Sequence, residues 1–76
     1  MRRVRTTPWG AQSMTPDERA ELERLTPEGY VLHIGCHRSL HDVTIRLSGP
    51  AGLVSELYGC STAYGPALRM LTEATA

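Results

Sequence analysis

The stretch DVTIRLS at residues 42–48 alternates apolar and polar side chains without a fault. Successive side chains of a β-strand point to opposite faces, so this pattern predicts a half-buried strand. Its apolar side chains are predicted to face a core and its polar ones to face away from it. The first set is Val43, Ile45 and Leu47, and the second includes Thr44 and Arg46.

Two further strands are predicted on either side of this one. The first covers residues 30–36 (YVLHIGC) and the second covers residues 53–60 (LVSELYGC). In the second, alternation places Leu53 and Leu57 inward and Cys60 outward. The GPAG segment before it is typical of a turn, and short connections favour antiparallel pairing of neighbouring strands. We therefore expect a three-stranded antiparallel meander.

A helix is predicted on each side of the meander along the chain. Thr15 and Glu18 match a capping box, and Pro16 suits the first helical position, so the first helix is expected from Pro16 to Leu25. Ser61 or Thr62 can cap the second helix, which has proline in its first turn. The apolar positions are Ala20, Leu22 and Leu25 in the first helix, and Ala63, Ala67, Met70, Leu71 and Ala74 in the second.

These elements predict an α+β, two-layer α-β-β-β-α fold with both helices on one face of the sheet. No other segment can bury the apolar face of the strands, so both helices are needed there. Residues 1–14 carry three arginines and no acid, and we expect them to form a flexible basic arm. Residues 15–76 are expected to form a single domain, which leaves the second face of the sheet open.

Length and composition limit the classes of function. The chain has 76 residues, 41% of them hydrophobic and 21% charged, which is typical of one small globular domain. No apolar run approaches the roughly 20 residues of a membrane-spanning helix, and no apolar signal-peptide core follows the first arginines. We expect a cytoplasmic protein without membrane contact. A pocket of enzymatic size is hard to enclose with so short a chain, so we expect no catalysis and no cofactor.

Charge is balanced overall but unevenly distributed. The formal net charge is zero, with +3 over residues 1–14, −3 over residues 15–29 and balance over residues 30–76. A neutral chain has no bulk attraction for nucleic acid or for an anionic membrane. It also lacks the large negative surplus that an imitator of DNA would need.

Thiol and imidazole side chains raise the question of a zinc site. Structural zinc sites usually contain two pairs of closely spaced ligands, whereas this sequence has one cluster of candidate ligands and a single cysteine far from it in the chain. Alternation also places the two cysteines on opposite faces, although a bulge near Gly35 or Gly59 would reverse that. We therefore predict no metal site. The residues concerned are His33, Cys36, His37, His41 and Cys60.

A disulfide and a nucleophilic site are both disfavoured. The first and third strands of a meander lie about 9–10 Å apart, beyond the roughly 7 Å between Cα atoms that a disulfide can bridge. Cys36 beside His37, or Ser39 with His41 and Asp42, could suggest a nucleophile and its base. Groups adjacent in sequence rarely point at one another in a strand or turn, so no catalytic residue is predicted.

The open sheet face carries the candidate binding residues. Tyrosine and arginine are enriched as anchors of protein interfaces, which favours contact with a partner protein. The alternative is a nucleic-acid surface, on which an aromatic side chain stacks a base and the N-terminal arginines reach phosphates. A plain solvated face remains a third interpretation. The partner-binding candidates are Tyr58, Arg46, His33, Glu56 and Val54, and the nucleic-acid candidates are Arg2, Arg3 and Arg5.

In element order, residues 15–76 resemble the double-stranded-RNA-binding domain. That family binds phosphates with a basic cluster at the start of its last helix. Here residues 61–69 contain one arginine and no lysine. The resemblance therefore covers topology and not the RNA-binding residues.

In size, element order and composition the chain also resembles the small inhibitor proteins of phages and mobile elements, such as anti-CRISPR proteins. This resemblance implies an inhibitor that binds a host nucleic-acid-processing protein complex. A two-layer sandwich this thin has little core to spare, so we also expect a homodimer formed through the open face or an edge strand.

Overall fold

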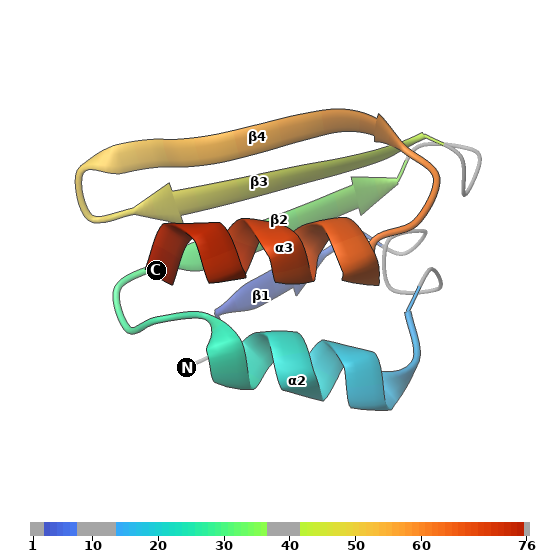
Figure 1. Ribbon diagram of the computed structural model, residues 1–76, viewed down its shortest axis with the longest axis horizontal. Helices are drawn as coiled ribbons and strands as arrows, with labels where there is room; N and C mark the ends of the chain where they lie inside the picture. The colour runs from blue at the N-terminus through green and yellow to red at the C-terminus, as the bar shows by residue number, and fades with distance from the viewer. Residues whose placement is uncertain (1–2, 8–13, 37–41, 76) are drawn as a thin grey trace.

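The computed structural model describes residues 3–7, 14–36 and 42–75, without the Cys36 side chain. A four-stranded mixed sheet in the order β1-β2-β3-β4 packs against two helices (Figure 1). The α+β class with both helices on one face is confirmed, and the three predicted strands pair antiparallel, but the prediction of a three-stranded sheet is incomplete because a fourth strand joins it in parallel. The elements are β1 (Val4–Thr6), α2 (Pro16–Leu25), β2 (Val31–Cys36), β3 (Val43–Gly49), β4 (Gly52–Cys60) and α3 (Tyr64–Thr75).

The additional strand, β1, lies parallel to β2 at one edge of the sheet. We expected a flexible arm over residues 1–14, yet Val4 is 1% exposed in the core and pairs with Leu32. The Leu32 N–H donates to the Arg3 carbonyl oxygen at 2.7 Å, which continues the pairing. Periodicity could not reveal β1, because a three-residue strand with one buried side chain has no repeat.

The first helix begins and ends at the predicted residues. The Glu18 N–H donates to Thr15 Oγ1 at 3.1 Å, and the Thr15 N–H donates to the Glu18 carboxylate at 2.9 Å, which completes the capping box. Leu22 is fully buried, but Ala20 is exposed, contrary to prediction. The ten-residue helix thus buries only a narrow stripe, against α3 and β1.

The core lies between the helices and one face of the sheet. Its strand residues include the three apolar side chains of β3, which are fully buried as predicted. On α3 the last buried residue is Leu71, so Ala74 is exposed in the final turn, contrary to prediction. No helix in the described part of the chain is long and apolar enough to span a membrane. The core residues are Val4, Met14, Leu22, Leu32, Ile34, Val43, Ile45, Leu47, Ala63, Ala67, Met70 and Leu71.

Strand β4 pairs with β3 through two irregularities that change which face its side chains occupy. Ser48 pairs with Leu53 and Leu47 pairs with Ser55, so Val54 has no partner in the register. A bulge adds one residue and shifts the alternation by one. Leu53 therefore shares the open face with Ser48 and is 58% exposed, which makes the inward prediction wrong.

The second irregularity lies at the other end of β4. Val43 pairs with Cys60 and Ile45 pairs with Leu57, so two residues of β4 oppose Thr44 alone. Gly59 has a φ of +67°, a left-handed conformation that favours glycine at such a bulge. The shift places Cys60 beside the core, half-buried, and the prediction that it faces outward is wrong.

Candidate interaction surface on the open sheet face

The sheet face that no helix covers carries one polar row across all four strands. Arg5 of β1 pairs with His33 of β2, His33 pairs with Arg46 of β3, and Arg46 pairs with Glu56 of β4. Directly paired residues lie on the same face of a sheet, so this register brings four side chains from distant parts of the chain together. Arg5, His33 and Arg46 are exposed.

Arg46 and Glu56 form an ion pair at the β4 end of this row. The Arg46 Nε donates to Glu56 Oε2 at 2.7 Å, and the two side chains are 50% and 23% exposed. This contact fixes one edge of the guanidinium, while half of the side chain stays open to solvent. The pair is thus a positioned polar group, because each partner limits the rotamers of the other.

Tyr58 completes a three-residue group with this ion pair. Its hydroxyl beside Glu56 holds the pKa of the carboxyl below its ordinary value of 4.5, and Arg46 adds to the same effect, while burial opposes it. The same hydroxyl, followed by Glu56, raises the pKa of Arg46. Both charges are therefore present at neutral pH, next to an aromatic side chain that is 66% exposed.

An apolar region borders the charged group along β4. Among the described residues, every large hydrophobic side chain that is exposed lies on this strand. Ser55 and Leu57 pair with core-facing residues of β3, so Val54 and Tyr58 belong to the open face by alternation. The exposed set is Leu53, Val54, Leu57 and Tyr58.

The structure brings together most of the predicted partner-binding residues. Tyr58, Arg46 and Glu56 form one group, His33 pairs with Arg46, and Val54 lies further along β4. We refer to these five residues, together with Arg5 and Leu53, as the open-face surface. Sequence reasoning did not place Arg5 or Leu53 there, because β1 and the bulge at Val54 leave no periodic signal.

Arg3 and Arg5 do not lie on the same side of β1. Arg5 lies on the open face, whereas the Arg3 side chain reaches back toward α2, where Nη1 lies 3.5 Å from the Thr26 carbonyl oxygen that accepts its hydrogen bond. Arg2 lies outside the described residues. In the described part of the chain, the nucleic-acid candidates are therefore directed to different sides of β1.

The thiol and imidazole residues do not form a described metal site. Val43 of β3 pairs with Cys36 of β2 on one side and with Cys60 of β4 on the other, so the backbones of the two cysteines lie in one row across the sheet. The bulge at Gly59 thus removes the objection based on opposite faces. No group of three potential metal ligands occurs among the described residues, and His37 and His41 lie outside them.

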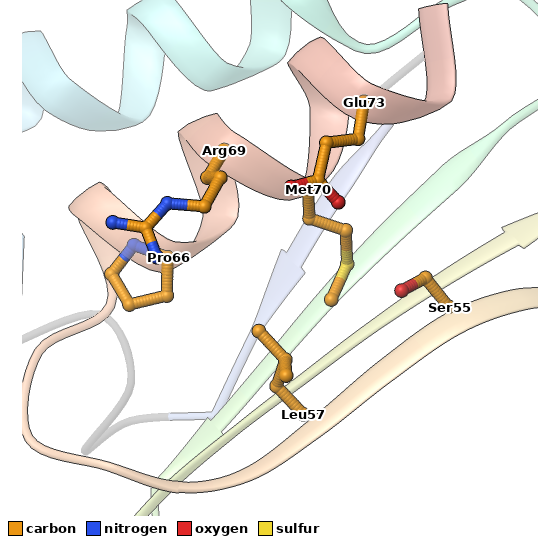
Figure 2. Close-up of a pocket in the computed structure, with 6 residues that line it drawn as sticks. All are labelled: Ser55, Leu57, Pro66, Arg69, Met70 and Glu73. Atoms are coloured by element: carbon orange, nitrogen blue, oxygen red, sulfur yellow. The ribbon is translucent and has the colours of Figure 1, made fainter.

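On the opposite side of β4, a groove separates this strand from α3. Its volume is about 250 Å³, and Figure 2 shows Leu57 from the sheet and Met70 from the helix pointing into it. Leu57 is 42% exposed at this groove. The remaining lining residues are Ser55, Pro66, Arg69 and Glu73.

Comparisons of the chain with protein-family models, with curated proteins and with solved structures find no match.

Proposed function

We propose that this protein is a non-enzymatic interaction module that binds a partner protein through the open-face surface. The observation that carries the proposal is the group of Tyr58, Arg46 and Glu56. It combines a largely exposed aromatic ring with an ion pair whose geometry is already fixed. Positioned arginine and tyrosine side chains lose little conformational freedom on binding, which makes them effective anchors.

The surroundings of this group have the organisation of a protein interface. Leu53 and Val54 provide apolar area beside the charges, at 58% and 50% exposure. Protein interfaces combine an apolar centre with polar groups that are already satisfied, and this surface has both. The partner would present a flat or shallowly curved apolar patch with a hydrogen-bonding group opposite Arg46.

The resemblance to small phage-type inhibitors supports a more specific partner, a host nucleic-acid-processing protein complex. The protein would then act by occluding a surface of that complex. Such a role needs no catalytic group and no cofactor, and it fits a chain of zero net charge because recognition depends on shape and positioned anchors.

The decisive experiment uses a double variant with a matched control. Tyr58→Ala with Arg46→Ala removes both anchors, and we expect it to abolish binding to the partner while the melting temperature changes little. The control is Arg24→Ala, which also removes an exposed ion pair, with Glu21, but on α2. A partner first captured by the wild type from host extract is purified, and its affinity for all three proteins is measured. Equal affinity for the wild type and the double variant would contradict the proposal.

A second candidate function, binding of nucleic acid, rests on the row of Arg5, His33 and Arg46. The register aligns these three side chains across the open face, where a phosphate backbone could lie with a base stacked on Tyr58. The ion pair with Glu56 weighs against it, because the charge of one of the two arginines in the row is already neutralised.

This alternative is tested by fluorescence anisotropy with single- and double-stranded DNA and RNA, at low and at physiological salt. Binding that weakens steeply with salt and is reduced by Arg5→Ala would support it. No binding at low salt rejects it. Deletion of residues 2–5 is unsuitable as a test, because it also removes the buried Val4.

A further inference from the structure

The free edge of β4 is the least protected part of the described structure. The strand spans nine residues, and only β3 pairs with it, so one side of its backbone has hydrogen-bonding groups without a strand partner. Folded proteins usually protect such an edge with a charge, a proline, a bulge or a covering element. The sole charged residue on β4 is Glu56, which Arg46 neutralises, the strand contains no proline, and its two irregularities leave residues 55–57 in regular pairing between them.

Apolar side chains project from both faces of this edge. Leu57 lies on the helix side, at the groove, while Tyr58 lies on the open side. A covering helix could bury only one of these faces. An added strand would border both faces at once and would also satisfy the free backbone groups.

We propose that a second copy of this chain occupies this edge, with its β4 antiparallel to the first around a two-fold axis. The sheet then continues through both copies as eight strands. Pairing of a strand with itself requires that its side chains match their own reversed order, and β4 meets this requirement in a register centred on Leu57.

That register places Leu57 opposite Leu57 of the second copy. Glu56 then lies opposite Tyr58 of the second copy, so the carboxylate faces a polar aromatic side chain rather than a second carboxylate. A register centred on Glu56 would place two carboxylates directly opposite, which destabilises a pair of strands. A register centred on Ser55 would place Glu56 opposite Val54 and would leave the carboxylate beside an apolar partner.

The zero net charge of the chain also favours this occupant, because two copies approach without overall repulsion. The proposal does not depend on the function proposed above, since it rests on the backbone edge of β4 and on Leu57, which the open-face surface does not include, although Glu56 and Tyr58 border both. In the dimer, the two groups of Tyr58, Arg46 and Glu56 would lie next to each other on one continuous face. The two grooves beside α3 would meet on the other face, across a floor that contains both Leu57 side chains.

The oligomeric state of the full chain is the first test. Sedimentation equilibrium over a concentration series is expected to give twice 8.4 kDa for the wild type. Leu57→Lys places two like charges opposite each other and is expected to give a monomer. Ala20→Lys, an exposed position on α2, is the control and should remain a dimer. A wild type that stays monomeric at every concentration overturns the proposal, as does a Leu57→Lys variant that stays dimeric.

A second measurement keeps the register testable even if Leu57→Lys fails to fold. Leu57→Cys and Ser55→Cys are made in a chain whose two native cysteines are replaced by serine, and both are exposed to mild oxidation. Rapid crosslinking of Leu57→Cys alone is expected, because only that position faces itself. Crosslinking of Ser55→Cys alone would show a different register, and absence of crosslinking in both would show that β4 does not pair with itself; either result overturns the proposal. Equal rates for both variants would indicate collision without fixed pairing, which also overturns it.

Discussion

The two edges of the sheet differ in how their free backbone hydrogen-bonding groups are covered. At the β1 edge the strand has three residues, and the Glu23 carboxylate of α2 accepts hydrogen bonds from the backbone N–H groups of Arg3 and Val4. The β4 edge strand is nine residues long and carries the exposed apolar side chains, and no comparable carboxylate contact covers it in the described structure. The comparison shows that one acidic side chain covers the short β1 edge, whereas β4 pairs with β3 alone among the described residues.

The largest expected effect comes from making the same valine-to-alanine substitution at each of the two edges and comparing the losses of stability. Val4→Ala removes apolar atoms from a core position that is 1% exposed and should lower the free energy of unfolding by about 2 kcal/mol. Val54→Ala, at 50% exposure, should stay within about 0.5 kcal/mol of the wild type. Urea unfolding of both variants checks this. Equal losses would mean that β1 contributes no more to the fold than the surface of β4.

The next effect concerns Glu23, whose carboxylate accepts the two hydrogen bonds at the β1 edge. Glu23→Ala leaves two backbone donors at the β1 edge without their acceptor, so we expect a loss of about 1–2 kcal/mol in the free energy of unfolding. Glu21→Ala is the control, since it removes an exposed ion pair with Arg24 and should cost less than about 0.5 kcal/mol. Hydrogen exchange at the Val4 amide should become faster in the first variant and not in the second.

These first two predictions concern features that the sequence could not reveal. The capping box, the three long strands and the face covered by both helices follow from local patterns, and the structure confirms them. The strand β1 depends on one buried valine and on a carboxylate from α2, and no periodicity encodes either contact. Leu53 and Cys60 were assigned to the wrong faces because each bulge moves the alternation by one residue.

The candidate site likewise combines residues whose placement follows from local alternation with residues whose placement depends on distant contacts. Tyr58, Arg46, Glu56 and His33 could be assigned to one face because they lie between or beside the bulges, where alternation holds. Arg5 is predicted as part of a basic arm and not on this face, because its position there depends on the pairing of β1. The groove beside Leu57 was also missed, since its shape depends on how far α3 extends over the edge strand.

A glycine comparison sharpens the account of β4. Gly59→Ala should cost about 1 kcal/mol in the free energy of unfolding, because an alanine is strained at a φ of +67°. Gly65→Ala, in the first turn of α3, should change stability by less than this and in the stabilising direction. An added Cβ meets no atom within 4 Å at either position, so the difference measures backbone conformation alone. A loss of similar size at both positions would contradict the assignment of the bulge.

The smallest effect is a pH dependence on the open face. The pKa of Glu56 is lowered in the folded state, so its contribution to stability is present above pH 4.5 and is lost as the pH falls through the folded-state pKa. Tyr58→Phe should raise the pKa of this carboxyl, because the hydrogen bond from the Tyr58 hydroxyl is the largest single cause of its lowering, and Arg46→Ala should raise it as well. Carboxyl ¹³C NMR titration of the three proteins measures the shifts. An unchanged value in Tyr58→Phe would show that the hydroxyl does not act on Glu56.

The parallel pairing of β1 with β2 also sets an order of events during folding. Strands β3 and β4 meet across the short turn between Gly49 and Gly52, whereas Val4 must find Leu32 across the whole of α2. Contacts distant in the chain form more slowly, because the entropy of closing the loop must be lost first. The meander is therefore expected to assemble first, and β1 to dock last. Until it docks, the sheet has two bare edges and the molecule is most prone to aggregate. Docking of β1, which the Glu23 carboxylate holds in place, is thus expected to end the period in which the sheet has two bare edges.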